Sequence, residues 1–598
     1  MKIARIKIKN FRGIKDGEIL FPDHVVLVGD NNSGKSTILE AIDLVLGPER
    51  LSKHPVIDEH DFYAGQYIDN ENNPIDIQIE VILINLTADQ QLHFRNHLEF
   101  WNKINNQLIE GPPPEATDDE NVKIALRIGF KGYYDLDEDD FFGETFFLSP
   151  TNLEGESFDK LSTRDKRKIG FLYLRTLRTG TRALSLERGS LLDIILKLKE
   201  IRPQMWEDVL SQLHEVSVAK DPELGISDIL ISVQEAVRKI VPVECADSPS
   251  LKVSHLTREH LRKVLTVFMG TGVCIEDGTE YLAPYTHQGT GTINILVLTL
   301  LSIIAELKQN VIFAMEEPET AIPPHTQKRV INSVIAKSSQ AIFTSHSPYV
   351  LEEVSPSQII SINRLNGVLT SFPVNLPPAI KEKMYREEIK RRFCEAILAR
   401  RILIVEGRTE YDVIRSVSGR LEEIDPSKYS SLDSLGISII NAMTDTQIAP
   451  LGDYFRKLGK ITYAIFDKQE KEESLLIKNS VDYAYESAEK GIENVILNES
   501  KDTALKDFAL AIVKSGEWPT HLKDLMPTEE MSIEDIKSSL RKYFKSNKGE
   551  GAIANFLEQC TKDEMPKYFV DIIDSISCTV MTKFESKHDE PTIVEEGD

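Results

Sequence analysis

Acidic side chains follow two apolar segments in the last third of the chain. Residues 402–405 read Ile-Leu-Ile-Val and lead into Glu406, a glycine and Glu410, while the largely apolar residues 461–466 lead into Asp467. Segments of this kind, alternating with helical patterns, predict a parallel sheet whose strand ends open onto a ligand crevice. We predict that Glu406 and Asp467 coordinate a divalent metal for in-line attack on phosphorus. Glu410 and Glu493 could hold a second ion.

The same pattern indicates the elements that must position these acids. We expect strands at 401–405, 437–441 and 461–466, a helix at 411–417 and a later helix at 552–557. A basic helix is expected at 381–401, immediately before the first strand.

A phosphate-binding loop is predicted near the start of the chain. Residues 29–36 read Gly-Asp-Asn-Asn-Ser-Gly-Lys-Ser, after a buried strand at 25–28 and before a helical pattern at 37–46. Such a loop curls its backbone N–H groups around phosphates at a helix N-terminus. Lys35 should meet the terminal phosphates and Ser36 should ligate Mg²⁺. The expected nucleotide-binding residues of this segment are Gly29, Asn32, Gly34, Lys35, Ser36 and Thr37.

Paired carboxylates follow another apolar strand nearly three hundred residues later. The strand at 311–315 runs into Glu316-Glu317-Pro318-Glu319. Glu316 is expected to hold Mg²⁺, and Glu317 to polarise the attacking water as catalytic base. A solvated acidic turn is the alternative. A further strand at 341–344 leads to His346, which could contact the γ-phosphate, although a lone histidine after a strand is usually structural.

These segments together resemble the ABC-type ATPases of the SMC, Rad50 and RecF group. The resemblance is carried by Asn10-Phe11-Arg12, the phosphate loop, residues 316–319 and Thr344-Ser345-His346-Ser347-Pro348. It implies that ATP is sandwiched between two heads and that Arg12 and His346 belong to the nucleotide site. It also implies a signature loop that reaches across the dimer, best matched by Gly289 and Gly291 before the helix at 293–307.

The C-terminal part resembles the Toprim domain, through Val-Glu-Gly-Arg-Thr-Glu at 405–410 and the strand that ends in Asp467. An SMC-like ATPase fused to a C-terminal Toprim domain is similar to the OLD (overcoming lysogenization defect) nucleases, with class 2 features at 316–327. That family implies roles for a downstream acid, matched by Glu493, and a late catalytic lysine, matched by Lys548. Toprim domains usually carry Asp-x-Asp, whereas this chain has Gln469 at the second position, which leaves the number of metals open.

The expected fold class is α/β, with an ABC/SMC-like ATPase head, a helical dimerisation insertion and a Toprim Rossmann-like parallel sheet. The predicted domains are an ATPase N-terminal lobe at 1–165, a helical insertion at 166–255, an ATPase C-terminal lobe at 256–395, and a Toprim domain with a short acidic tail at 396–598. Helices at 191–198 and 226–240 either pair two protomers or pack as an intramolecular hairpin. A basic stretch at 164–182 is a phosphate track or a solvated face, and we slightly favour the latter.

Composition excludes several other classes. The five cysteines lack the paired spacing of a zinc ribbon, and no apolar run reaches the roughly 18 residues of a membrane span. The N-terminus alternates polar and apolar residues, unlike a signal peptide, so we expect a cytoplasmic protein. A net charge of −25 disfavours nonspecific adhesion to DNA over the whole surface, but local basic faces remain compatible with it.

These observations predict an ATP-gated, Mg²⁺-dependent DNA endonuclease or nickase, with Mn²⁺ as a possible substitute. The family resemblance implies anti-phage defence, a homodimer or higher even oligomer, and a partner. The partner would be an SF1 helicase or a retron reverse transcriptase with its DNA. The rival hypothesis is a noncatalytic RecF-like DNA-binding ATPase or repair mediator, in which a degenerate Toprim domain only docks partners. The glutamine at 469 favours the rival, whereas Glu406, Glu410, Glu493 and Lys548 together oppose it.

Overall fold

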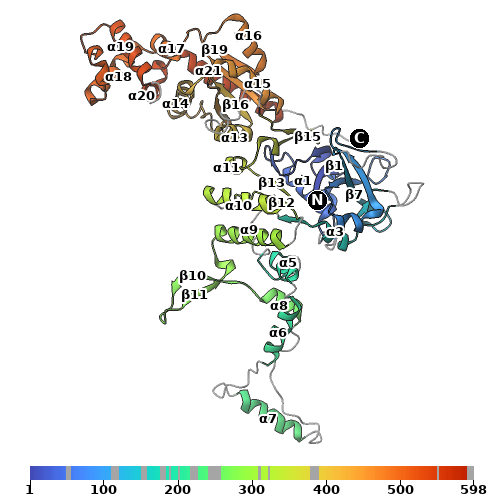
Figure 1. Ribbon diagram of the computed structural model, residues 1–598. Helices are drawn as coiled ribbons and strands as arrows, with labels where there is room; N and C mark the ends of the chain where they lie inside the picture. Colours follow the sequence, from blue (N-terminus) through green and yellow to red (C-terminus); the bar gives the residue numbers. More distant parts are fainter. Residues whose placement is uncertain are drawn as a thin grey trace, which may run out of the picture. The chain divides into compact units, whose positions relative to one another are not determined.

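The chain forms two compact units, described here from a computed structural model (Figure 1). The described residues are 1–48, 55–109, 120–149, 158–174, 184–187, 190–199, 202–215, 226–239, 257–307, 311–320, 323–376, 390–547 and 551–588. The first unit comprises Met1–Leu27, Gly34–Val354 and Arg364–Thr370, and the second comprises Val28–Ser33, Ser355–Asn363 and Ser371–Asp598. The domain boundaries expected from the sequence stay predictions.

A 13-stranded sheet contains most strands of the first unit, and its residues 28, 359–363 and 371–373 belong to the second. Its order is β6-β5-β7-β4-β1-β2-β15-β14-β3-β13-β12-β9, with β8 paired to β7. The strands are β1 (Lys2–Phe11), β2 (Ile14–Leu20), β3 (Val25–Val28), β4 (Ile77–Ile84), β5 (Leu98–Asn102), β6 (Gln107–Leu108), β7 (Val122–Asp135), β8 (Asp140–Phe147), β9 (Phe171–Leu174), β12 (Ile312–Glu316), β13 (Gln340–Thr344), β14 (Ile359–Leu365) and β15 (Val368–Pro373). Strands β3, β13, β12 and β9 run parallel, whereas β1, β2, β4, β5 and β7 pair antiparallel.

Helices and one separate hairpin complete the first unit. The phosphate loop leads into α1 (Lys35–Leu46), and α9 (Thr290–Leu307) lies against α10 (Pro324–Lys337), with Ser302 and Ser333 hydrogen-bonded at 3.0 Å. The predicted helix at 191–198 is confirmed as α5 (Leu191–Leu198), and the one at 226–240 is α7 (Ile226–Arg238). Helices α6 (Arg202–Glu215) and α8 (Arg258–Val264) accompany them, and β10 (Phe268–Cys274) pairs with β11 (Glu280–Pro284) as a sheet of its own.

In the described part of the chain, no helix is both long and apolar enough to cross a membrane.

The second unit is built on a four-stranded parallel sheet in the order β17-β16-β18-β19. Three strands, β16 (Arg401–Val405), β17 (Ile437–Asn441) and β18 (Ile461–Phe466), confirm the predicted ones, and β19 (Tyr483–Glu486) is additional. The surrounding helices are α13 (Lys390–Leu398), α14 (Arg408–Ile424), α15 (Ile448–Lys457), α16 (Lys471–Ser480), α17 (Ile492–Glu499), α18 (Asp502–Ser515), α19 (Ile533–Ser546), α20 (Ala552–Gln559) and α21 (Lys567–His588). The expected basic helix at 381–401 is wrong at its C-terminal end, because the helix stops at Leu398 and Arg401 already belongs to β16.

The basic stretch at 164–182 is not a uniformly solvated face. Lys166, in α3 (Thr163–Ile169), has only 1% of its surface exposed, and its Nζ donates a hydrogen bond of 3.2 Å to the carbonyl of Leu44 near the end of α1. The expectation of a phosphate track or a solvated face is therefore wrong at this residue. Arg175, Arg178 and Arg182 lie outside the described residues.

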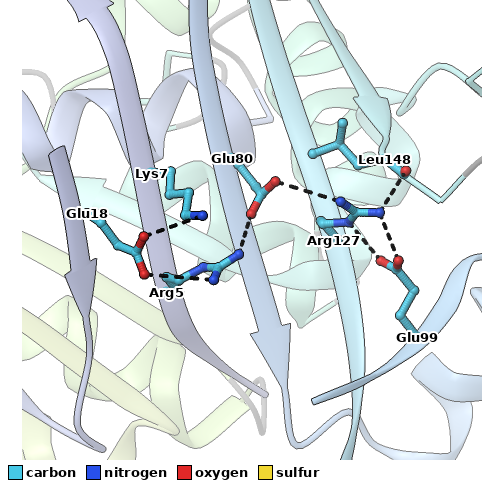
Figure 2. Close-up of polar contacts among 7 residues, drawn as sticks. All are labelled: Arg5, Lys7, Glu18, Glu80, Glu99, Arg127 and Leu148. Atoms are coloured by element: carbon cyan, nitrogen blue, oxygen red, sulfur yellow. Dashed lines mark hydrogen bonds and ion pairs between the residues drawn. The ribbon is translucent and has the colours of Figure 1, made fainter. Parts of the chain in front are cut away.

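A ladder of alternating charges crosses five strands of the antiparallel part of the sheet (Figure 2). Arg5 lies between Glu18 at 3.7 Å and Glu80 at 2.7 Å, and Glu80 continues to Arg127 at 3.9 Å. Arg127 makes a two-pronged contact with Glu99 at 2.9 and 3.0 Å and donates to the Leu148 carbonyl, while Lys7 lies 3.4 Å from Glu18. Because Arg5 is buried, these carboxylates are needed to balance its positive charge.

We expect Glu80→Gln to destabilise the first unit more than Glu18→Gln. Glu80 bridges two arginines and its side chain is only 22% exposed, so its loss should lower the free energy of unfolding by about 1–3 kcal/mol. Glu18 is 44% exposed, and its loss should cost about 0.5 kcal/mol or less. Chemical denaturation of both variants measures the difference. Equal losses of stability in the two variants would mean that the central position of Glu80 contributes no more to the free energy of unfolding than the exposed position of Glu18.

A pH-dependent stability is expected from Lys166. Burial lowers its pKa to about 7 from the ordinary 10.5, so between these values the unfolded chain holds a proton that the folded chain has released. The stability contributed by this residue therefore rises with pH across that window. Lys166→Met should raise the melting temperature most at pH 7 and below, and the gain should shrink toward pH 10. Lys168→Met in the same helix is the control, and a pH-independent effect of Lys166→Met would contradict the expectation.

Candidate nucleotide and metal sites

The phosphate loop has the backbone geometry that its residue types predict. Three of its residues have positive φ, namely Gly29 at 155°, Asn32 at 65° and Gly34 at 101°, and the Ser33 N–H closes a turn on the Asp30 carbonyl. A Cβ on Gly29 would lie 2.4 Å from the carbonyl oxygen of Ile362, so the loop requires glycine there. Helix α1 begins at Lys35, two residues before the predicted start, and Ser36 and Thr37 complete its first turn. The N–H groups at a helix N-terminus suit a phosphate.

Arg12 is held by two acids that the sequence analysis did not identify. Its guanidinium lies 2.6 Å from the carboxylate of Glu40 in α1 and 2.7 Å from that of Asp61. The backbone N–H of Arg12 also donates to the backbone carbonyl of Asp61. Burial opposes its charge, but the hydrogen bond to Asp61 and the charges of Glu40 and Asp61 outweigh burial, so the pKa of Arg12 is raised. No local signal pairs these residues, since Asp61 is 49 positions away from Arg12.

A cavity of about 740 Å³ adjoins Arg12. It is lined by Arg12, Gly13, Pro55, Val56, Ile57, Asp58, His60, Asp61, Phe62, Ala64 and Gly65. Its volume lies within the range of small-molecule sites. The expectation that Arg12 contacts nucleotide stays a prediction.

Strand register brings the acids and His346 to one edge of the first unit's sheet. Thr344 is paired with Leu27 of β3 on one side and with Glu316 of β12 on the other. The segments that follow these parallel strands therefore leave the same edge. Glu316 accepts a 2.7 Å hydrogen bond from the Tyr173 hydroxyl, which orients it. Glu317 has a φ of 43°, unusual for a residue with a side chain, and its N–H donates to the Thr344 carbonyl at 2.9 Å.

Glu319 connects the acidic turn to the turn that carries His346. One oxygen of its carboxylate accepts hydrogen bonds from the Ser345 hydroxyl and from the backbone N–H of His346, both at 2.8 Å. Burial raises the pKa of this carboxyl. The Ser347 hydroxyl donates to Gln327 of α10 at 2.9 Å, which fixes the other end of the turn. The His346 residue itself is exposed, so Glu319, which was not selected from the sequence, anchors its backbone while leaving the ring accessible.

The two glycines matched to a signature loop lie at the start of α9. Gly289 precedes the helix and Gly291 belongs to its first turn, because α9 begins at Thr290, three residues before the predicted start. Among the described residues, and apart from the two chain neighbours of Gly289, no atom lies within 4 Å of the position that a Cβ would take there, so this backbone is open on the described side. Contact with the nucleotide of another head stays a prediction.

Glu406 and Asp467 are neighbours at the carboxyl edge of the second sheet. Val405 of β16 is paired with Ile465 of β18, and the Asp467 N–H donates to a Glu406 carboxylate oxygen at 3.3 Å. Burial raises the pKa of the Glu406 carboxyl, and the negative charges of Asp467, Glu410 and Asp445 raise it further. Several carboxylates close enough to oppose one another's ionisation are stabilised by a shared cation. The sequence analysis missed Asp445, which follows β17 by four residues.

The other predicted acids also lie at this edge. Asp467 accepts a 2.7 Å hydrogen bond from the N–H of Gly491, whose φ of 91° directs the chain into α17. Glu493 is in the first turn of α17, where its side chain is 5% exposed, and Lys545 Nζ lies 4.0 Å from it. Glu410 is in the first turn of α14, immediately after Gly407. The structure thus gathers acids from three separate segments.

The donor set fits a hard divalent cation, since carboxylate oxygens are the ligands preferred by Mg²⁺ and Mn²⁺. Within the described residues, no three of these side chains already surround a common ion position.

Gln469 stands where Toprim domains usually carry the second acid of Asp-x-Asp. Its backbone N–H donates to the Glu486 carboxylate at 3.2 Å, so this loop is fixed through its backbone. Lys548 lies outside the described residues. Its described flanks, Asn547 and Gly551, line a cavity of about 10 Å³ together with Thr409 and Asp412 of α14.

Two family models match the chain. The model described as "AAA ATPase domain" matches residues 1–173 and 183–351. The model described as "Overcoming lysogenization defect protein-like, TOPRIM domain" matches residues 397–468, a segment that includes Glu406, Glu410 and Asp467 but ends before Glu493.

Three relatives match most of the chain. "Endonuclease GajA" of Bacillus cereus (strain VD045) is 21% identical over 451 residues, which cover 71% of this chain and 68% of that protein. "OLD nuclease" of Thermus scotoductus is 22% identical over 462 residues, covering 71% and 75%. "Old nuclease" of Escherichia phage P2 is 22% identical over 454 residues, covering 72% of each. Among solved structures, the SMC head domain from Thermotoga maritima matches 63% of this chain and all of that one, at 11% identity and a TM-score of 0.29.

Glu319→Ala should slow nucleotide hydrolysis without weakening nucleotide binding. The change removes the acceptor for Ser345 and for the His346 N–H, interactions worth about 1.5–3 kcal/mol with a charged partner, or roughly 10- to 100-fold in rate. Glu319→Gln keeps an acceptor oxygen and should retain most of the rate. Steady-state hydrolysis and nucleotide titration measure the two effects. Glu353→Ala, which removes an ion pair with Lys328 and a hydrogen bond from Asn332, is the control, and wild-type hydrolysis by Glu319→Ala would refute the anchoring role.

Proposed function

This chain belongs to the AAA ATPase domain family and, with its OLD-like TOPRIM domain, to the OLD family of ATPase–Toprim nucleases, and from that premise we propose an ATP-gated, Mg²⁺-dependent DNA endonuclease or nickase. The observation that carries the proposal is the contact between Glu406 and Asp467, at a strand edge where burial and then the neighbouring acids raise the pKa of Glu406. Acids arranged this way suit a metal-assisted reaction at phosphorus.

The carboxylates of the second unit have distinct tasks in this proposal. Glu406 and Asp467 hold the metal, and Glu410 and Glu493 complete its surroundings from the first turns of α14 and α17. The bound metal supplies an activated water and neutralises charge on the scissile phosphate. The N–H of Gly491 donates a hydrogen bond to one oxygen of Asp467, which orients this carboxylate at the strand edge. Lys548 is proposed to assist catalysis, as the family resemblance implies.

The first unit binds and hydrolyses ATP in this proposal. Lys35 meets the terminal phosphates, Ser36 and Glu316 hold Mg²⁺, and Glu317 takes up the proton of the attacking water. The strained backbone at Glu317 supports that role, since a positive φ in a residue with a side chain is typical of functional sites. His346 contacts the γ-phosphate, and Gly289 and Gly291 approach the nucleotide of a second head. A homodimer or higher even oligomer follows from this arrangement.

The biological setting is also a proposal. We infer a cytoplasmic protein of anti-phage defence that acts with an SF1 helicase or with a retron reverse transcriptase and its DNA. The second candidate is a noncatalytic RecF-like mediator whose Toprim domain docks partners. It is favoured by one observation, the glutamine at 469, which removes one acid from the metal site.

The decisive experiment is cleavage of supercoiled plasmid by the purified protein. With Mg²⁺ or Mn²⁺ we expect nicked or linear DNA, abolished in Glu406→Ala because that variant lacks a metal ligand. ATP should alter the wild-type rate but not the rate of Lys35→Ala, which cannot neutralise the terminal phosphates. Plasmid gel assays with and without ATP measure both effects. Cleavage that persists in Glu406→Ala would place the nuclease site elsewhere, and ATP-dependent DNA binding without any cleavage would favour the mediator.

A further inference from the structure

One face of α19 carries exposed cations at the rim of the acidic site. Arg541 Nε donates a 3.2 Å hydrogen bond to the side-chain oxygen of Asn494, and Lys545 Nζ lies 4.0 Å from Glu493. Glu493 and Asn494 lie in the first turn of α17, which begins directly after Gly491, the residue whose N–H donates to Asp467. The C-terminal half of α19 therefore lies next to the first turn of α17, which carries one of the acids of the candidate metal site.

The charge of this face is compensated only in part. Residues 536–547 include Lys537, Arg541, Lys542 and Lys545 and no acidic residue, in a chain whose net charge is −25. Lys537 is paired with Asp502 at 2.7 Å. The other three are exposed, and within the described residues neither Arg541 nor Lys542 forms an ion pair with a carboxylate.

The opposite face of the helix explains why these cations point outward. Ile536, Leu540, Tyr543 and Phe544 are buried in the core of the second unit, which leaves positions 541, 542 and 545 on the solvent side. Cations near a helix C-terminus are commonly explained by the helix dipole. That explanation covers Lys545 in the last turn but not Arg541 and Lys542, which precede that turn in a helix ending at Ser546.

We propose that Arg541, Lys542 and Lys545 bind the sugar–phosphate backbone of a DNA strand and guide it to the acids around Glu406 and Asp467. The proposal rests on the proposed nuclease function. A site rich in carboxylates repels the phosphates that it must cleave, so a substrate needs cations beside the site to compensate. Arg541 and Lys545 are one helical turn apart, about 6 Å along the axis, so they can contact successive points on one strand.

Fluorescence anisotropy with the full-length protein and a labelled DNA duplex tests this role. The variant Arg541→Gln/Lys542→Gln/Lys545→Gln should bind at least ~10-fold more weakly, and the slope of log affinity against log salt should fall by about 0.9 for each phosphate that the variant no longer neutralises. In plasmid cleavage, KM should rise while kcat at saturating DNA changes little. Arg541→Lys should keep the salt slope, because it keeps the charge. Far-ultraviolet circular dichroism and the melting temperature confirm that each variant is folded.

A charge-matched control separates a local contact from a change in net charge. Lys501→Gln/Lys514→Gln/Lys523→Gln removes three exposed lysines on and beside α18 and should bind DNA as the wild type does. An equal loss of affinity in both triple variants would overturn the proposal. So would a cleavage defect with unchanged affinity and salt slope, wild-type protein that binds no DNA, or salt-dependent binding that occurs only with RNA.

The same measurements distinguish this proposal from the nuclease function on which it rests. Glu406→Ala should lose cleavage and retain the salt-dependent binding. If the wild type binds DNA and cuts none, while only the α19 variant loses binding, the basic face is supported and the nuclease function fails.

Discussion

The register of parallel strands is the constraint on which both candidate sites depend. In the first unit, Thr344 pairs with both Leu27 and Glu316, so the segments after β3, β13 and β12 leave the sheet at one edge. In the second unit, the pairing of Val405 with Ile465 brings Glu406 to the N–H of Asp467. A shift of either register would separate these groups although every strand remained formed. The buried Val, Ile and Phe side chains that fix the register therefore determine the chemistry indirectly.

Both sites combine charges that oppose folding with backbone contacts that retain them. Glu319 is partly buried in the acidic turn, and a serine hydroxyl and a backbone N–H hold its carboxylate. Asp467 is held by the N–H of Gly491, and Glu406 by the N–H of Asp467. Each backbone donor favours the ionised carboxylate, whereas the neighbouring acids disfavour it. The sites are therefore preorganised to accept positive charge, because the strand ends and the helices that follow them bring the carboxylates to one edge.

The sequence predicted those parts of the structure that depend on local pattern. Strands 437–441 and 461–466 and the helix at 191–198 agree with the structure to the residue, because apolar runs and helical periodicity are local signals. Lys166 could not be predicted, since its burial depends on Leu44, 122 positions away. Asp445 and Glu319 were missed for a related reason. Only the tertiary structure shows that the charge of Asp445 raises the pKa of Glu406 and that Glu319 accepts a hydrogen bond from the N–H of His346. Residues inside motifs could be selected from the sequence, and their roles stay predictions, whereas the residues that contact them could not be selected.

The position of β3 in the sheet has a consequence for biosynthesis. This four-residue strand is fully apolar and buried, and one of its partners, β13, is synthesised more than three hundred residues later. During translation at roughly 5–20 residues per second, the strand and the phosphate loop after it must wait for tens of seconds without that neighbour. Contacts of such sequence separation slow folding and leave apolar edges exposed. The ATPase unit is therefore expected to complete its folding late on the ribosome and to need protection from aggregation until β13 emerges.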